Sequence, residues 1–205
     1  MKINKKRDII LDAMQKLMTQ NSAQAISVSD IAKEAGIGKG SIYYYFKSKE
    51  DILEAVIERS YSDAVQKAKE LVETSELDAL TKMEVIFRTC RESSLELLRQ
   101  EANNFFELQQ SALMHQQFIR IMVKNLKPIL ADIIRQGNME GSIYCKSPEE
   151  VSEIVLILLT IKLDRQLSGT SAAQTSKTLD VFAYMLEKSF SIEKGKLSYL
   201  WSDIT

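Results

Sequence analysis

Cysteine and histidine are scarce in this chain of 205 residues, which holds two cysteines and one histidine. Cys90 and Cys145 form no C-x-x-C motif, so we interpret both as small buried thiols of a protein in a reducing compartment. The single histidine, His115, excludes a histidine-based metal cluster, and Ala112 stands where a Glu-x-x-His motif would need glutamate. We therefore expect no metal, no other cofactor and no catalytic residues.

Proline and glycine are also few, two and seven residues respectively, which argues against a turn-rich β architecture. With 45% hydrophobic residues, the composition predicts an all-α fold of one or two packed units. No apolar run approaches the ~20 residues of a membrane span, and the longest, residues 155–159, suits a buried helix. The basic N-terminus passes directly into an amphipathic pattern that contains acids, unlike a signal peptide. We expect a cytoplasmic protein.

The chain also lacks a strong net charge, because 27 Lys and Arg residues nearly balance 28 Asp and Glu residues. The charges are unevenly distributed: residues 1–49 carry nine basic and four acidic residues, whereas the remainder carries 18 basic and 24 acidic residues. This asymmetry places positive potential toward the N-terminal end, as phosphate binding requires. For the cluster Lys5-Lys6-Arg7, the sequence leaves a phosphate contact and a merely solvated surface equally open.

The most informative stretch is residues 27–50, SVSDIAKEAGIGKGSIYYYFKSKE, which predicts two short helices joined by a tight turn. Ser27 or Ser29 can cap the first helix, whose residues at helical spacing form one apolar face. Gly36 ends that helix where the backbone turns left-handed, and the second helix spans roughly 39–46. Such a helix-turn-helix places its second helix in the DNA major groove. The alternative is a helical corner of a core that never meets nucleic acid.

The run IAKEAGIGKGSIYYYFKSKEDIL within this region resembles the signature of TetR-type transcriptional regulators, the tetracycline-repressor-like family. The shared positions are Ile31-Ala32, Ala35-Gly36, Gly40, Tyr43, Tyr44-Tyr45-Phe46, Lys49-Glu50 and Leu53. The match covers about the first sixty residues, and the rest is similar only in size and helical character. Gly38 departs from the family pattern, which often has Ser or Thr there, and the aromatic and Gly usual near residues 18–22 are absent.

The resemblance implies a helix-turn-helix DNA-binding domain at residues 1–60, with its motif at about 27–46, and a helical ligand-binding and dimerisation domain at residues 61–205. A long helix would join the two domains, and the whole chain would have about nine helices. We expect a homodimer through the last two long helices, because they are apolar over wide arcs and a palindromic operator needs a twofold-symmetric reader. The alternative is that both apolar faces are buried within one chain.

The resemblance also implies which residues contact DNA. Tyr44 and Lys49 resemble family positions that reach phosphates, and Ser27 and Ser29 can donate to another phosphate from the start of the first motif helix. We expect base contacts from the exposed first turns of the second motif helix. The predicted DNA-binding residues are Ser27, Ser29, Lys39, Gly40, Ser41, Tyr43, Tyr44 and Lys49. Among the three tyrosines, Tyr45 is expected inside together with Phe46.

The other helices follow from apolar residues at helical spacing. They are expected at about 3–20, 48–72, 80–98, 105–133 in two parts, 147–167 and 175–192. Ile9 belongs to the inward stripe of the first helix, and the break in 105–133 is expected near residues 114 and 115. Pro128 should kink or loosen the helix that contains it, and Gly137 and Gly141 should bracket a turn.

The resemblance further implies an apolar ligand cavity among the middle helices. Candidate lining residues are Phe87, Cys90, Phe105, Phe106, Met114, His115, Phe118, Met122 and Leu158. Residues of these types at helical spacing form core more often than pocket. Lys162 either meets an anionic ligand or joins an ion pair at the dimer interface, and the sequence favours the ion pair.

These expectations describe a ligand-responsive transcriptional regulator, by family default a repressor, which binds a palindromic operator as a dimer and is released by a small molecule. Its expected partners are double-stranded DNA, an unknown effector and a second copy of the chain, with no membrane. The alternative function is a helical small-molecule-binding adaptor or co-regulator that acts through protein contacts without sequence-specific DNA binding. Lys39, Tyr44 and Lys49 argue against it, because an adaptor has no reason to keep all three exposed.

Overall fold

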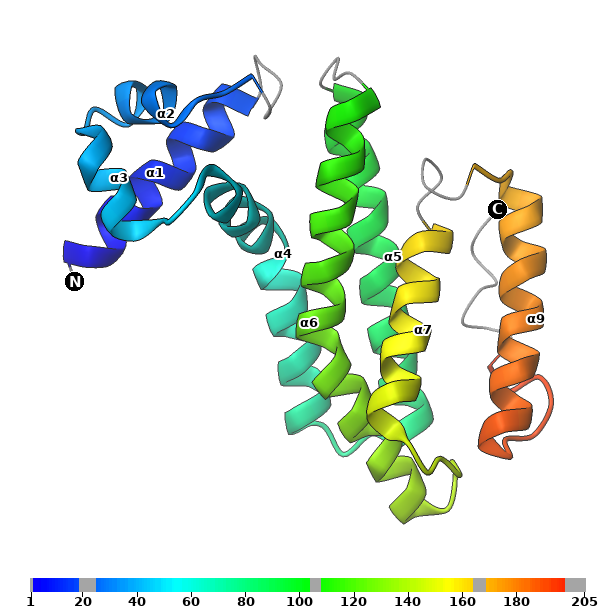
Figure 1. Ribbon diagram of the computed structural model, residues 1–205. Helices are drawn as coiled ribbons and strands as arrows, with labels where there is room; N and C mark the ends of the chain where they lie inside the picture. Colours follow the sequence, from blue (N-terminus) through cyan, green and yellow to red (C-terminus); the bar gives the residue numbers. More distant parts are fainter. Residues whose placement is uncertain (1, 19–24, 104–107, 164–168, 198–205) are drawn as a thin grey trace. The chain divides into compact units, whose positions relative to one another are not determined.

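The computed structural model of the chain describes residues 2–18, 25–103, 108–163 and 169–197, and leaves out the side chains of residues 2–4, 60, 61, 63, 64, 71, 93–103 and 108–115. Eight helices occupy these ranges (Figure 1). They are α1 (Lys2–Met18), α2 (Val28–Glu34), α3 (Lys39–Tyr45), α4 (Lys49–Thr74), α5 (Ala79–Asn103), α6 (Leu108–Glu140), α7 (Pro148–Leu163) and α9 (Ala172–Phe190). No β-strand occurs in the described residues, and the all-α prediction is confirmed.

The chain divides into two compact units, Met1–Ser62 with Arg99–Ile121, and Asp63–Leu98 with Met122–Thr205. The first unit contains α1, α2 and α3, and the second contains α7 and α9, whereas α4, α5 and α6 contribute to both. The expected domain boundary at residues 60 and 61 falls inside α4 and stays a prediction.

The core of the first unit is built from the apolar faces of α1 to α4. Its fully buried side chains include Ile10, Leu11, Met14, Ile31, Ile42 and Ile52. Ile9 was expected in the same stripe but is 37% exposed. It lies about 100° from Ile10 on a helix of 3.6 residues per turn, which turns it out of the buried arc. Arg59 of α4 holds α1 from the polar side, donating to Asp12 Oδ1 at 2.8 Å and to Gln15 Oε1 at 2.7 Å.

The long helix α6 is continuous over 33 residues, so the predicted break near residues 114 and 115 is wrong. Pro128 lies inside it, and the helix continues although proline has no N–H for the carbonyl four residues earlier. Ile121 and Leu126 before the proline and Ile133 after it are all buried. The helix lacks one hydrogen bond at the proline. The buried side chains on both sides outweigh this loss, because each buried aliphatic side chain contributes about 1.5–3 kcal/mol.

The segment after α6 folds back on the helix, and Gly137 makes this possible. Gly137 was expected in the turn but lies within the last turn of α6, while Gly141 (φ +73°) follows the helix end. A Cβ atom on Gly137 would lie 2.6 Å from Cδ1 of Ile143, which is buried in that position. The glycine is therefore required by the close approach of Ile143, while the left-handed backbone at Gly141 turns the chain.

Two further contacts hold this connection in place. The side chain of Asn138 accepts from the amide of Cys145 and donates to its carbonyl, both at 2.8 Å. The amide of Tyr144 donates to the carbonyl of Phe190 at 2.8 Å, which ties the connection to the end of α9. Cys145 is half-buried, so the expectation of two buried thiols is correct for Cys90 alone.

The starts of the last two described helices are well defined. α7 begins at Pro148 and is described to Leu163, and its predicted end near 167 lies outside the described residues. α9 begins at Ala172, three residues earlier than expected, because Ser171 and Gln174 form a capping box. The Ser171 hydroxyl accepts from the Gln174 amide at 3.3 Å, and the Gln174 side chain accepts from the Ser171 amide at 3.0 Å.

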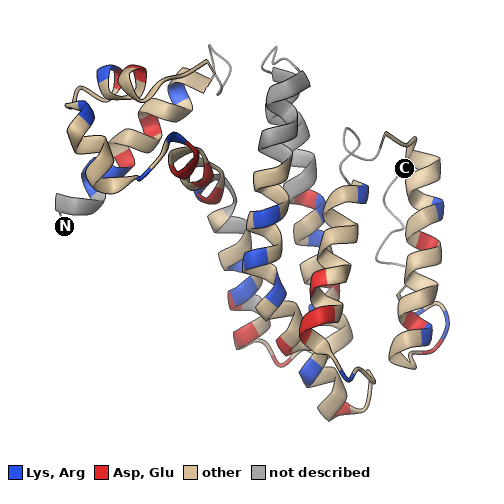
Figure 2. Ribbon diagram, in the orientation of Figure 1, with Lys and Arg blue, Asp and Glu red and all other residues tan. Residues whose placement is uncertain are grey.

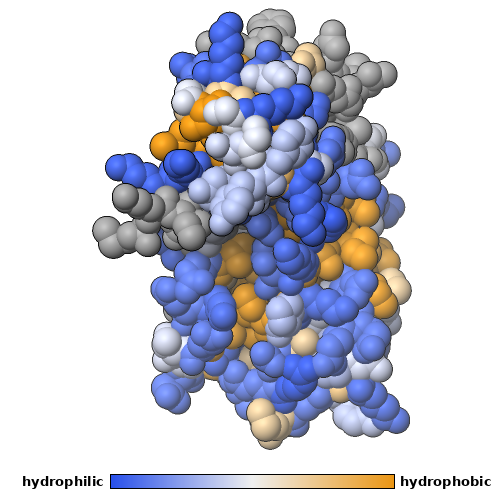
Figure 3. Space-filling view, turned by 60° about the vertical axis from the view of Figure 1, so that its left-hand side comes forward, coloured by the Kyte–Doolittle hydropathy of each residue, from blue (hydrophilic) through white to orange (hydrophobic). Residues whose placement is uncertain are grey.

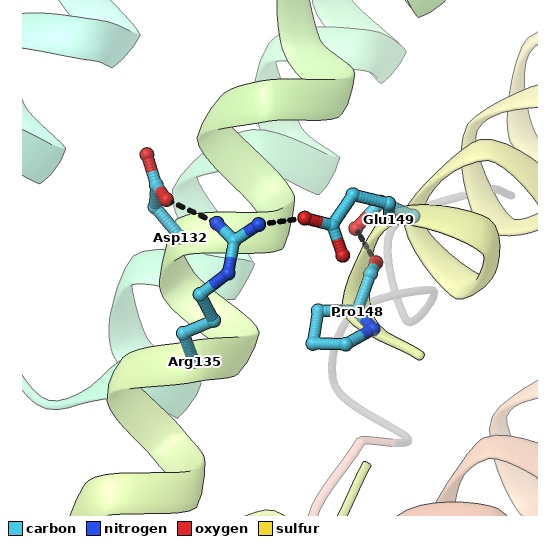
Figure 4. Close-up of polar contacts among 5 residues, drawn as sticks. Asp132, Arg135, Pro148 and Glu149 are labelled. Carbon is cyan, nitrogen blue, oxygen red and sulfur yellow. Dashed lines mark hydrogen bonds and ion pairs between the residues drawn. The ribbon is translucent and has the colours of Figure 1, made fainter. Parts of the chain in front are cut away.

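Two ion pairs join α6 to α7. Arg135 of α6 contacts Asp132 on its own helix and Glu149 in the first turn of α7 (Figure 4). Lys127 pairs with Glu153 further along. These groups are partly exposed, and such pairs contribute only about 0–1 kcal/mol each. They orient α7 on α6, while the stability of the unit rests on its buried apolar side chains.

Candidate nucleic-acid interface

The site begins at the capped start of α2. The hydroxyl of Ser27 accepts from the amide of Asp30 at 3.2 Å, and the carboxylate of Asp30 accepts from the amide of Ser27 at 2.9 Å. The Ser27 hydroxyl also donates to the Asp30 carboxylate at 2.6 Å, and this bond holds the pKa of Asp30 below its usual value. The hydroxyl proton of Ser27, predicted to reach a phosphate, is therefore used inside the cap. Ser29 is exposed beside it.

The sequence predicted Ser27 or Ser29 as the cap, and the cap is Ser27. The hydrogen bond from its hydroxyl to Asp30 was missed, although Ser-x-x-Asp at residues 27–30 is a recognisable variant of the capping-box pattern. The box fixes where α2 starts. It also places a carboxylate at the N-terminus of α2, which is the end to which a phosphate would be attracted.

The turn between α2 and α3 depends on Gly36, whose φ is +65°. An added Cβ would meet no atom within 4 Å, so the left-handed backbone is the feature that requires glycine here. The next amide, of Ile37, donates to the carbonyl of Ala32 at 3.0 Å, which closes the turn. Ala32 is 5% exposed, as expected for a small residue where two helices meet. Figure 1 shows α3 running at a steep angle to α2.

The outer face of α3 is rich in exposed groups. Ile42 is fully buried and Phe46, which follows the helix, is 6% exposed, whereas Tyr43 is 51% and Tyr44 75% exposed. Tyr45 was expected inside but is half-buried, and its ring meets that of Tyr44 edge-on with centroids 5.0 Å apart. The edge-on contact restricts the Tyr44 ring, although most of this side chain stays exposed to solvent.

The start of α3 carries the smaller predicted contact residues. Lys39 and Gly40 are exposed and Ser41 is half-buried. An added Cβ on Gly40 would meet nothing within 4 Å, so a partner can approach the backbone closely there. Gly38 caps the helix without a side-chain hydrogen bond, as expected from the absence of Ser or Thr at this position.

After α3, a second cap starts α4. The Ser48 hydroxyl accepts from the amide of Asp51 at 3.1 Å, which confirms Ser48 as the cap. The Asp51 carboxylate accepts from the amide of Lys47 at 3.0 Å, one residue before the position that a regular capping box uses. Lys49 is half-buried in the first turn of α4. Figure 2 shows basic residues on α1, on α2 and at both ends of α3.

The predicted ligand-binding residues are only partly described. Phe87, Cys90, Phe118 and Met122 are buried. Leu158 and Lys162 are half-buried on α7. Phe105 and Phe106 lie outside the described residues, as do the side chains of Met114 and His115. Burial raises the pKa of the Cys90 thiol to about 12, so this thiol is neutral and unreactive.

Both α7 and α9 expose apolar side chains. Apolar side chains also lie among hydrophilic ones on the different face that Figure 3 presents. On α7, Ile154 is 61% and Ile157 39% exposed. On α9, Val181 is 54%, Tyr184 48% and Met185 59% exposed. The two helices contact each other, so these side chains belong to neighbouring surfaces of one unit.

Two features of the described residues concern metal binding and membrane insertion. No group of three or more His, Cys, Asp or Glu side chains able to hold a metal ion occurs in that part of the chain. Every helix in the same residues is too short or too polar to cross a membrane.

Comparisons with known proteins assign the chain to a family. Residues 10–56 match the family described as "Bacterial regulatory proteins, tetR family", and residues 98–185 match the "Tetracyclin repressor-like, C-terminal domain". The chain is 31% identical over 138 residues to the fatty acid metabolism regulator protein of Bacillus subtilis (strain 168), covering 65% of this chain and 69% of that protein. It is 26% identical over 143 residues to the transcriptional repressor KstR2 of Mycolicibacterium smegmatis, covering 67% of each chain.

Solved structures share the fold over most of the chain. The complex of RolR with resorcinol has a TM-score of 0.65 at 16% identity, covering 98% of this chain and 95% of RolR. The fatty acid degradation regulator FadR from Bacillus halodurans has a TM-score of 0.57 at 18% identity, covering 88% and 94%. The family-specific matches over both parts of the chain, with the helix-turn-helix geometry at α2 and α3, show that the chain belongs to the TetR family of DNA-binding transcriptional regulators.

Proposed function

We propose that this regulator is a repressor that binds a palindromic operator as a homodimer and is released by a small molecule. The observation that carries the proposal is the outer face of α3, where Tyr43 and Tyr44 are exposed while Ile42 and Phe46 anchor the helix. Large aromatic side chains are usually buried unless a partner covers them. On a helix-turn-helix, that partner is the DNA major groove.

The proposed contacts follow from which groups are exposed. Lys39 donates to guanine O6 or N7, and Gly40 lets the α3 backbone approach the bases. Tyr43 reads bases or sugar edges, and the Tyr44 hydroxyl reaches a phosphate. Ser29 donates to a second phosphate from the first turn of α2, where the Ser27 hydroxyl is already committed.

Three contacts complete the proposed interface. Ser41, half-buried, adds a loose hydroxyl contact, and Lys49 contributes charge from the start of α4. Ser27 takes part through its position at the start of α2 and its cap, which holds the first turn of the helix rigid.

The dimer is proposed to form through α7 and α9. Ile154 on α7 and Val181, Tyr184 and Met185 on α9 are exposed, and two copies of this helix pair can bury them in a four-helix bundle. A twofold axis through such a bundle relates the two α3 helices, as the twofold symmetry of a palindromic operator requires. The dimer then presents two recognition helices about one DNA turn apart, ~34 Å.

The proposed effector is a small, mainly apolar molecule bound by residues 61–205. Phe87, Cys90 and Met122 supply buried apolar groups, and Leu158 and Lys162 of α7 are half-buried candidates. Phe118, Phe105, Met114 and His115 remain candidates from the sequence. The similarity to a fatty acid metabolism regulator makes acyl compounds the first class to screen.

Release from DNA requires that effector binding favours one of two conformations of the dimer, by its differential affinity for them. Within the first unit, Arg120 of α6 pairs with Glu54 of α4. This ion pair supports a route by which a shift of α6 moves α4, whose first turn follows α3 directly. Catalysis is not part of the proposal, and we place the protein in the cytoplasm, where a DNA-binding regulator acts.

The test is selection of binding sites from a random DNA pool, with the wild type compared with Lys39→Ala and Tyr44→Ala. The wild type should enrich a palindrome, and each variant should bind it at least about 30-fold more weakly, because a lost base or phosphate contact costs about 1–3 kcal/mol and each contact is made twice in the dimer. Tyr144→Ala and Lys146→Ala are matched controls at exposed positions of the second unit and should bind as the wild type does.

If a folded wild-type dimer enriches no site, with or without small molecules extracted from cells, the repressor proposal is wrong and the adaptor function gains support. Equal losses in the control variants would show that the contacts assigned to α3 are wrong. Once the operator is known, acyl compounds can be tested directly for release of the DNA.

A further inference from the structure

The start of α1 carries three exposed basic residues, Lys5, Lys6 and Arg7, which the contacts proposed above leave unused. The guanidinium carbon of Arg7 lies 5.3 Å from the ring centroid of Phe46, a cation–π contact. Phe46 is the C-cap residue of the recognition helix α3 and is 6% exposed. The start of α1 therefore lies directly beside the C-terminal end of α3.

The three basic residues point in different directions around α1. At about 100° per residue, Lys6 and Arg7 lie within about 60° of Ile10, whereas Lys5 lies about 140° away. Ile10 is fully buried, so Lys6 and Arg7 share the side of α1 that packs into the core of the first unit, against α2. Because they precede the first buried residue of the helix, they remain exposed.

The acidic residues of α1 lie on its opposite side. Asp8 and Asp12 are each about 160° from Ile10 on the same wheel, and Asp12 pairs with Arg59. Within the described residues, no carboxylate pairs with the side chains of Lys6, Arg7 or Lys47. In the described part of the chain, the positive charges beside the end of α3 are therefore not held in ion pairs.

Lys47 extends this basic surface from the other side. It follows Phe46 directly, its side chain is exposed, and its amide donates to the carboxylate of Asp51 at 3.0 Å, which fixes its backbone. Lys6, Arg7 and Lys47 thus come from two separate segments, which the contact of Arg7 with Phe46 brings side by side. We call these three residues the α1–α3 basic surface.

The length of α3 indicates what this surface meets. With seven residues, α3 is about 10 Å long, close to the ~12 Å width of the major groove that it enters. A helix this short leaves the segments that flank it near the groove edges, where the phosphates are. Because the N-terminal residues of α3 meet the base edges, we propose that the α1–α3 basic surface binds backbone phosphates at the edge of the groove nearest the C-terminal end of α3. This inference rests on the proposed operator binding and extends it to a second element, α1.

Arg7 suits this role because of its geometry. The contact with the aromatic ring uses the charge of the guanidinium. The N–H donors in the guanidinium plane stay available to a phosphate oxygen. The ring of Phe46 orders the side chain before DNA binds, so less side-chain entropy is lost on binding. Contacts of this kind raise affinity and salt dependence without selecting a base sequence.

The test measures the salt dependence of operator binding for Lys6→Gln, Arg7→Gln and Lys47→Gln, with Lys5→Gln as the matched control. Each contact is made twice in a dimer, so its loss should lower the slope of log K against log salt by about 1.8. This corresponds to about 30-fold weaker binding at 0.15 M salt if binding is equal at 1 M. Lys5→Gln removes the same charge one residue away and should change the slope by less than half as much.

The ratio of affinities for the operator and for a scrambled duplex of equal length should stay the same in all four variants. Equal slopes for Lys6→Gln and Lys5→Gln would overturn the inference, since only the general field of the protein would then matter. A changed operator preference would also overturn it, by showing base readout. Melting temperatures check folding, and Lys6→Gln serves as the second variant if Arg7→Gln disturbs Phe46.

These outcomes separate the inference from the proposed function. If the wild type binds a selected operator and all four variants have its slope, the inference alone fails. If the wild type binds no duplex of any sequence, both fail.

Discussion

Replacement of Gly137 by alanine tests the packing that positions the connection between α6 and α7. An added Cβ would lie 2.6 Å from Cδ1, 2.7 Å from Cγ1 and 2.9 Å from Cβ of Ile143. Rotation of the Ile143 side chain can move its outer two atoms away from the new methyl group. It cannot move Cβ, so the backbone of one segment must shift as well.

Two opposing effects set the magnitude. Overpacking of this kind costs about 1–3 kcal/mol. Replacing glycine by alanine inside a helix returns about 0.5–1 kcal/mol. We therefore expect Gly137→Ala to lower the free energy of unfolding by about 1–2 kcal/mol, which for a chain of this size lowers the melting temperature by about 2–8 °C.

Urea unfolding followed by circular dichroism, at one fixed protein concentration, measures this change. Gly40→Ala is the matched control, because Gly40 is also helical and its added Cβ meets nothing within 4 Å. It should gain about 0.5–1 kcal/mol. In an Ile143→Ala background, two of the three close atoms are gone, and the cost of Gly137→Ala should fall by about 1 kcal/mol. If the Gly137→Ala variant were as stable as the Gly40→Ala variant, the close approach of Ile143 would be refuted.

Three further predictions concern other parts of the chain. Met185→Glu places a charge on the proposed dimer face and should yield monomers in sedimentation at micromolar concentration, whereas Met139→Glu, at another exposed methionine, should leave the dimer intact. Burial raises the pKa of Glu140, but hydrogen bonds to its carboxylate outweigh this and lower the pKa below the usual 4.5. Its stabilising effect should be present above about pH 4.5 and disappear as the pH falls further, so the acid loss of stability should be shallower for Glu140→Gln in urea titrations. A thiol reagent at pH 8 should modify Cys145 much faster than Cys90, because with a pKa of about 12 only about one Cys90 in 10⁴ is ionised; equal rates by mass spectrometry would contradict its burial.

The recognition element could be predicted from the sequence because its determinants are local. A serine before the helix and Gly36 at the turn act within a few residues of the backbone that they shape. The helical spacing around Ile42 likewise indicated which side of α3 is buried. The start of α7 at Pro148 followed from the same kind of local signal.

Other features could not be predicted because they join residues far apart in the chain. Gly137 looked like a turn residue, since nothing nearby in the sequence shows that Ile143 occupies the space of its missing side chain. The break expected in α6 failed for a related reason: polar residues at one point interrupt an apolar pattern without ending a helix whose next turns bury Phe118, Ile121 and Met122. Tyr45 was placed inside by pattern alone, whereas its degree of burial depends on the ring of Tyr44.

The sequence by itself therefore determined the all-α class, the helix-turn-helix and the family, because caps, turn glycines and helical spacing act over short distances along the chain. Only the tertiary structure showed that Arg7 of α1 lies over Phe46 beside the end of α3, and that Arg120 of α6 pairs with Glu54 of α4. Such contacts form where separate helices pack together. The packed core decides which residues meet there, and local backbone preferences do not specify it.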